Sequence, residues 1–124
     1  MHKKIKKCFN LISIKLRQRT YNKRLHYIFE DNNSDCLLIV FPAFTGEKRR
    51  YNYIRGLKEF KSDKLFLLDD FGVKGSYLLF EGGSDIPLQL TKGLISKLLS
   101  KKAYSKVITL GSSKGGTSAI YYGL

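Results

Sequence analysis

Apolar residues gather in four short segments whose patterns are typical of β-strands. In residues 24–30 apolar side chains recur at every second position, as in a strand with one buried face. Residues 36–41 are continuously apolar, which indicates a strand buried on both faces. Two further apolar runs, at 64–69 and 107–110, predict a third and a fourth strand.

Helical patterns lie between and after these strands. Residues 85–99 predict a helix, because Asp85 can cap its start and Pro87 suits a first turn. Its buried face would consist of Leu90, Leu94, Ile95, Leu98 and Leu99. Another helix is expected in the basic segment 48–55, and a last one after residue 113. This alternation is typical of an α/β fold with a mostly parallel sheet, flanking helices and right-handed crossovers.

The first residues carry a different pattern. Apolar residues at Ile5, Phe9, Ile12 and Leu16 fall on one face of a helix, although residues 11–16 also alternate as a strand would. We expect this stripe to pack on the domain or on an adjoining part of the protein, with a membrane-surface helix as the alternative. The chain is thus divided into a basic amphipathic segment, 1–22, and a domain, 23–124.

Charge strengthens this division. The chain has 23 Lys and Arg against 10 Asp and Glu, a net charge of +13, and nine of the basic residues but no acidic one lie in residues 1–29. Such a segment can contact nucleic acid, anionic lipid or an acidic partner, or it can be solvated surface. We expect solvated surface or a peripheral membrane contact rather than nucleic acid.

The cysteines and the N-terminal residues indicate in which cellular compartment the chain is expected. Cys8 and Cys36 have no metal-ligand spacing, so we expect a reduced cytoplasmic chain without a metal or a cofactor. The apolar stretch 8–14 is too short for a signal peptide and no small-residue cleavage site follows it. No apolar run approaches the length of a membrane span. The predicted location is the cytoplasm, with peripheral membrane contact as a variant.

The most informative motif joins the last strand to the last helix. Residues 111–116 read Gly-Ser-Ser-Lys-Gly-Gly, a G-x-S-x-G pattern in which Ser113 would occupy a strained turn with positive φ. Such a turn presses the residues two before and two after the serine together, which explains Gly111 and Gly115, and Gly116 extends the small surface. The alternatives are a plain glycine- and serine-rich turn, or an anion site at the helix N-terminus to which Lys114 adds charge.

Two carboxylates follow the third predicted strand. Asp69 and Asp70 lie at its carboxyl end, the edge where α/β sheets bind ligands. They could shape a site there, or serve as caps and loop hydrogen-bond acceptors.

Together these features resemble the N-terminal half of an α/β-hydrolase, over residues 24–124. The pairing of residues 50–53, Arg-Tyr-Asn-Tyr, with the turn at 111–116 is also similar to bacterial hydrolase-like proteins of surface-polysaccharide or accessory-secretion loci. The resemblance implies that Ser113 is the nucleophile and that the Lys114 N–H is one oxyanion donor. The loop 42–46 would supply the second donor, through the N–H of Ala43 or Phe44.

The chain departs from this family in its acid and base. In the family both follow the serine, yet the eleven residues after Ser113 include no Asp, Glu or His, and the histidines are His2 and His26. We therefore expect an incomplete α/β-hydrolase-like fold that ends just after the serine turn at residues 111–116. The complete form would be a serine esterase or acyltransferase acting on a small-molecule or glycan ester, and this chain alone would have little activity.

Two further expectations follow. The last predicted strand would be an exposed sheet edge, which favours self-association or pairing with a C-terminal half. The alternative function is a non-catalytic module that binds an anion or another ligand at the turn, with the basic N-terminus contacting nucleic acid or anionic lipid.

Overall fold

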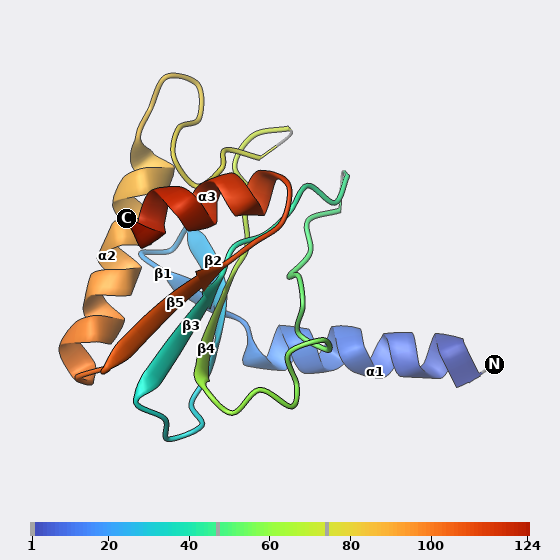
Figure 1. The fold of residues 1–124 in the computed structure, drawn as a ribbon. Helices are drawn as coiled ribbons and strands as arrows, with labels where there is room; N and C mark the ends of the chain where they lie inside the picture. Colours follow the sequence, from blue (N-terminus) through green and yellow to red (C-terminus); the bar gives the residue numbers. More distant parts are fainter. Residues whose placement is uncertain (1, 47, 74) are drawn as a thin grey trace.

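A five-stranded sheet forms the centre of the protein, with helices on both sides (Figure 1). The computed structural model describes residues 2–46, 48–73 and 75–124, without the side chains of residues 2 and 10. Its elements are α1 His2–Arg17, β1 Arg19–Tyr21, β2 Leu25–Glu30, β3 Cys36–Val40, β4 Asp63–Leu67, α2 Ile86–Lys101, β5 Lys106–Leu110 and α3 Lys114–Gly123. The four strands predicted from the sequence are confirmed, as are the helices predicted over 85–99 and after residue 113.

The sheet is mixed rather than mostly parallel. Its order is β1-β2-β4-β3-β5, and β3 pairs in parallel with β4 and β5, whereas β2 is antiparallel to both of its neighbours. The reversal of β2 begins with a tight hairpin from β1, in which Asn22 and Lys23 have φ of 48° and 59°. The pattern missed β1, because its three residues, Arg19–Tyr21, are largely exposed. Although it lies within the segment 1–22, β1 therefore belongs to the sheet.

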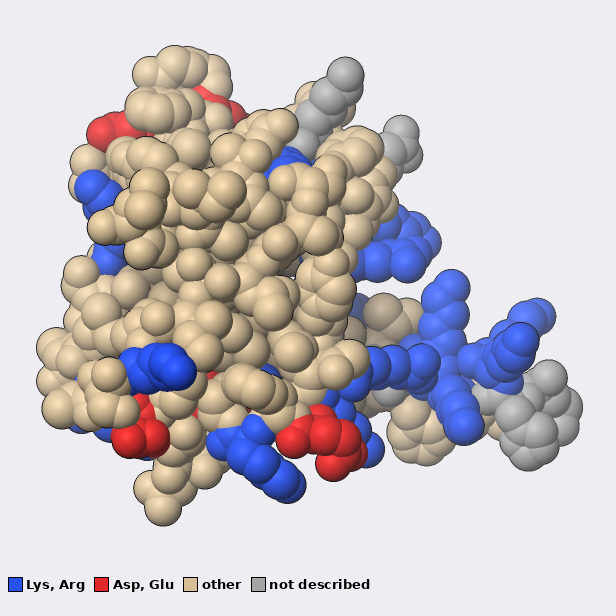
Figure 2. Space-filling view, viewed as in Figure 1, with Lys and Arg blue, Asp and Glu red and all other residues tan. Residues whose placement is uncertain are grey.

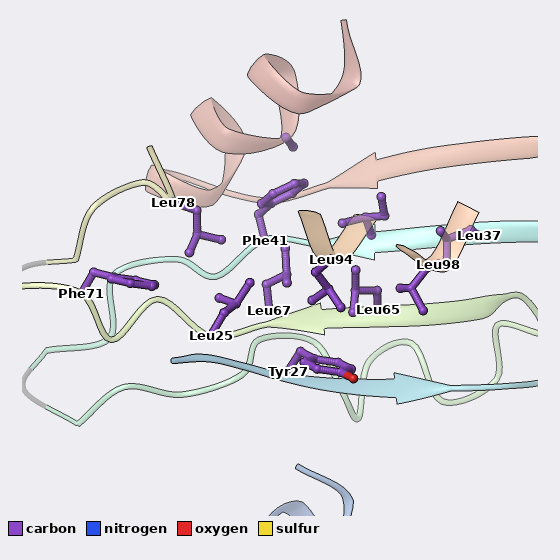
Figure 3. Close-up of a cluster of buried hydrophobic side chains, with 12 residues drawn as sticks. Leu25, Tyr27, Leu37, Phe41, Leu65, Leu67, Phe71, Leu78, Leu94 and Leu98 are labelled. Atoms are coloured by element: carbon purple, nitrogen blue, oxygen red, sulfur yellow. The ribbon is translucent and has the colours of Figure 1, made fainter. Parts of the chain in front are cut away.

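Alternate residues of the central strands build two cores. Leu37, Ile39 and Phe41 face α2 and α3, in the larger core shown in Figure 3. Leu38 and Val40 face the other side, where residues of the 51–57 segment and Ile14 of α1 cover them. The prediction that residues 36–41 are buried on both faces is confirmed for residues 37–41, which are at most 2% exposed, whereas Cys36 is half-buried.

The expected helix at 48–55 is wrong. Turns replace it, with hydrogen bonds such as Leu57 N–H to Tyr53 O at 3.0 Å. Tyr53 has φ of 67°, which no α-helix accommodates, and the Asn52 side chain turns back to accept a hydrogen bond from the Ala43 N–H at 2.9 Å. The segment therefore covers the second core without forming a regular helix.

Helix α2 follows its predicted pattern with two exceptions. Leu94 and Leu98 are buried, and Leu90 and Ile95 pack beside them. Leu99 is 41% exposed, because it lies 100° further around the helix than Leu98. Asp85 stands at the N-cap position without a capping bond. Its carboxylate instead accepts a hydrogen bond from the Gln89 side chain at 3.0 Å.

Residues 11–16, for which the sequence allowed either a helix or a strand, are part of helix α1. This helix projects from the domain (Figure 1). Its apolar stripe is exposed rather than packed on the described part of the domain, and the expected alternative, packing on an adjoining part of the protein, stays a prediction. Ile14, outside the stripe, is the α1 residue that joins the second core. None of the described helices is long and apolar enough to cross a membrane.

Candidate active site at the turn between β5 and α3

The turn after β5 has the strained geometry that its sequence predicts. Ser113 has φ of 52° and ψ of −122°, a conformation rare for a residue with a side chain, and the residue is exposed. A Cβ on Gly111 would lie 2.1 Å from the Gly115 carbonyl oxygen, and one on Gly115 would lie 2.6 Å from the Phe41 carbonyl oxygen. Both glycines are therefore required by contact with backbone, whereas a Cβ on Gly116 would meet nothing closer than 3.5 Å.

The amides at the start of α3 are mostly engaged within the turn. Gly115 N–H donates to Ser112 O at 2.9 Å, and Gly116 N–H donates to Ser113 O at 3.0 Å. Lys114 N–H has no hydrogen-bond acceptor among the described residues. The Lys114 N–H beside the serine hydroxyl is thus free to hold an oxyanion, whereas the amides of Gly115 and Gly116 are used within the turn.

The Lys114 side chain lies beneath the turn rather than over it. Its Nζ donates to the Asp69 carboxylate at 2.6 Å, and the two side chains are only 6% and 1% exposed. Asp69 also accepts hydrogen bonds from the Ser76 N–H at 2.7 Å and the Ser76 hydroxyl at 3.0 Å. Lys114 therefore adds no accessible cation to the turn. This buried position argues against the alternative function, a module that binds an anion at the turn. Asp69 acts as a buried anchor and not as an open carboxylate.

The loop after β4, which contains Asp69 and Ser76, contacts α3 at three successive turns of the helix. Below Lys114, Ser118 Oγ donates to Tyr77 O at 2.7 Å, and the Tyr122 hydroxyl donates to Leu78 O. Burial raises the pKa of Tyr122 to about 12. Tyr77 and Leu78 both have φ of 58°, so the loop is docked in a demanding conformation. The i, i+4, i+8 spacing of Lys114, Ser118 and Tyr122 can be seen in the sequence, but the loop that these side chains contact cannot.

Asp70 is separated from this arrangement. It accepts a hydrogen bond from Arg24 at 2.7 Å and lies 3.6 Å from His26 Nε2, while His26 Nδ1 contacts the Thr20 hydroxyl at 2.9 Å. His26 is on β2, and β4 and β3 stand between it and β5. Three strand spacings amount to roughly 14 Å, so His26 is not placed to act on Ser113. The side chain of His2 lies outside the described residues.

Two residues that were given no individual role in the sequence analysis, Asn52 and Tyr53, contact the loop after β3 and the turn respectively. Ala43 N–H donates to Asn52, as described above, so this predicted oxyanion donor is occupied. Phe44 N–H has no hydrogen-bond partner among the described residues and stays the available candidate in this loop. The hydroxyl of Tyr53 contacts Ser112 Oγ, directly beside the serine of interest. The motif at residues 50–53 was the available signal for both Asn52 and Tyr53.

No metal-ligand cluster of three or more His, Cys, Asp or Glu occurs among the described residues. Cys8 and Cys36 are both unpaired thiols.

Comparison with solved structures gives consistent matches. The capsule O-acetyltransferase of Neisseria meningitidis serogroup A, in complex with caged gadolinium, is 27% identical with a TM-score of 0.69, over 86% of this chain and 45% of that chain. A second structure of that enzyme gives 26% and 0.68 over the same shares. Its histidine-to-alanine mutant in complex with CoA gives 27% and 0.69, over 86% of this chain and 44% of that chain.

No protein-family model matches the chain, and no curated protein sequence matches it significantly. The chain is thus an α/β protein similar to part of a capsule O-acetyltransferase, and it spans less than half the length of that enzyme.

Proposed function

We propose that these residues are the nucleophile-bearing part of an O-acyltransferase that acts on a surface glycan, with Ser113 as the nucleophile. The observation that carries the proposal is the conformation of Ser113, which is exposed and strained between two glycines that backbone contacts require. The likeness to a capsule O-acetyltransferase supports both the acyl transfer and the glycan acceptor.

We also propose that the fold is the front of an α/β-hydrolase sheet. A reversed second strand, parallel β3, β4 and β5, and a serine turn directly after β5 support this assignment. Ser113 then projects at the carboxyl edge of the parallel strands, where ligands of such sheets bind.

The chemistry would proceed in two balanced steps. Ser113 Oγ attacks the carbonyl carbon of an acyl donor, such as a thioester of CoA, while Lys114 N–H and a loop amide hold the oxyanion. The new Oγ–C ester bond forms, the C–S bond breaks, and the thiol leaves with the proton taken from the serine. A glycan hydroxyl then attacks the acyl-serine, which transfers the acyl group and restores the hydroxyl of Ser113.

The base that moves this proton is, in our proposal, outside the 124 residues. His26 is committed to Thr20 and Asp70 on the far side of two strands. Without a positioned base a serine hydroxyl is a weak nucleophile, so transfer by this chain alone should be slow. The residues that complete the site would come from the part of the longer enzyme that this chain does not span.

The test is labelling of Ser113 by a fluorophosphonate, in this chain and in a longer protein that carries the missing acid and histidine. We expect the longer protein to react about 10²- to 10⁴-fold faster, the range that a positioned base contributes. Ser113→Ala should abolish labelling and acyl transfer to a glycan acceptor.

Ser112→Ala is the matched control, because Ser112 is an exposed serine on the same turn without the strained φ. It should retain labelling at position 113, as read by peptide mass spectrometry. Labelling that moves to Ser112, or that persists in Ser113→Ala, would show that Ser113 is not the nucleophile.

A further inference from the structure

The stripe of helix α1 faces water, although it has the composition of a buried surface. Ile5 is 48% exposed, Phe9 68%, Ile12 56% and Leu16 81%. At 100° per residue these four side chains lie within a narrow sector, nearly opposite Ile14, the residue that packs against the sheet. The orientation of α1 on the domain therefore turns its apolar side outward.

The rest of α1 is strongly basic. Its cationic residues are Lys3, Lys4, Lys6, Lys7, Lys15 and Arg17, and the helix contains no acid. All six are exposed, and Figure 2 shows blue side chains gathered around the projecting helix. Arg55 of the domain joins Lys3, Lys6 and Lys7 around one shallow hollow, which extends the same charge.

An outward apolar stripe within a basic surface matches one environment closely. In the interface of an anionic bilayer, apolar side chains enter the acyl boundary while lysines contact the headgroups. Nucleic acid would satisfy the lysines but leave Phe9 and Leu16 in water. A second copy of α1 would bury the stripe but bring two basic helices together.

We propose that α1 is a peripheral anchor that binds the surface of an anionic membrane through Ile5, Phe9, Ile12 and Leu16 and the surrounding lysines. The anchor is independent of Ser113 and of the acyl-transfer proposal.

The chain contains no tryptophan, so a single introduced tryptophan reports on its own surroundings. In the full chain, Phe9→Trp should show a blue-shifted emission on vesicles of phosphatidylcholine with about one third phosphatidylglycerol. Vesicles of phosphatidylcholine alone should give little shift. Phe80→Trp is the control, because Phe80 is 59% exposed at a site far from α1 in sequence and should not respond.

Co-sedimentation with the same vesicles measures the two contributions. Phe9→Ser with Ile12→Ser should weaken binding at least about tenfold, as should Lys3, Lys4, Lys6 and Lys7 all changed to Gln. The controls are Phe80→Ser with Ile86→Ser, which are 59% and 56% exposed, and the exposed lysines Lys92, Lys97, Lys101 and Lys106 changed to Gln. Neither control should change binding.

Three outcomes would overturn the anchor. The first is the absence of binding to anionic vesicles, and the second is equal weakening by the control variants. The third is a dimer in sedimentation velocity, or a complex with single-stranded DNA, that anionic vesicles do not displace and that Phe9→Ser with Ile12→Ser abolishes.

Discussion

Helices α3 and α1 differ in what holds them to the rest of the molecule. Helix α3 is fixed by the strained turn at Ser113, by the buried pair of Lys114 and Asp69, and by hydrogen bonds from Ser118 and Tyr122 to the 76–78 loop. Among its described side chains, helix α1 contributes Ile14 to the second core and pairs Arg17 with Glu30 of β2, and it leaves its apolar stripe in water. Both helices are amphipathic in sequence, so amphipathicity does not reveal which surface a helix covers.

The largest effect should come from removing one member of the buried pair. Asp69→Leu leaves the Lys114 ammonium buried without its acceptor and should cost about 3–5 kcal/mol in the free energy of unfolding. Lys114→Met should cost only about 1–3 kcal/mol, because Asp69 keeps its donors on Ser76. Urea denaturation of the two single variants and of the double variant measures the coupling.

Asp70→Leu serves as the comparison. It removes a partly exposed ion pair with Arg24 and should cost under about 1 kcal/mol. If the costs of the Asp69 and Lys114 substitutions simply add in the double variant, the pair does not hold α3 as described.

The next effect concerns the close contact in the turn. Gly111→Ala would place its Cβ against the Gly115 backbone and should destabilise the protein by about 1–3 kcal/mol or more. Gly116→Ala, five residues along, meets only an ordinary contact and gains helix propensity, so it should be neutral or slightly stabilising. Thermal unfolding of both variants distinguishes them, and equal losses would contradict the steric account of the turn.

A smaller effect of opposite sign is expected at the serine itself. Ser113→Gly relieves the strained backbone and should stabilise the chain by about 1 kcal/mol. Ser113→Ala keeps a Cβ in the same conformation and should leave stability nearly unchanged. Chemical denaturation of these variants tests whether the turn stores strain, and a loss of stability in Ser113→Gly would argue that it does not.

The smallest effect should be found on α1. Phe9→Ser with Ile12→Ser changes residues that touch little of the domain and should alter unfolding by less than about 0.5 kcal/mol. Ile14→Ala removes the packed residue and should cost about 1 kcal/mol, because its side chain is only partly buried. A large loss from the first variant would mean that the stripe does pack in solution.

Sequence reasoning succeeded where a local pattern determines the structure. The apolar runs give β3, β4 and β5, and Gly111 follows from a contact within the turn itself, whereas Gly115 is also required by the distant Phe41 carbonyl. It failed where partners are distant in sequence or polar in character. The hairpin strand β1 has only three, mostly exposed residues, and the pairing of Lys114 with Asp69 joins residues 45 positions apart.

The prediction of a helix at residues 48–55 was wrong for a related reason. Its composition allows a helix, but Asn52 accepts a hydrogen bond from the loop after β3, and this contact between two loops competes with helix formation. The eleven residues after Ser113 contain no Asp, Glu or His, so the acid and base of the proposed site stay a prediction.

The three contacts between α3 and the 69–78 loop have a practical consequence for engineering. A designer who grafts the serine turn onto another sheet would transfer residues 111–123 as one piece and lose the acceptors of Lys114, Ser118 and Tyr122. The transferred helix would then carry a buried, unneutralised ammonium into its new host. The transplantable unit is therefore discontinuous and consists of the turn, α3 and the loop together.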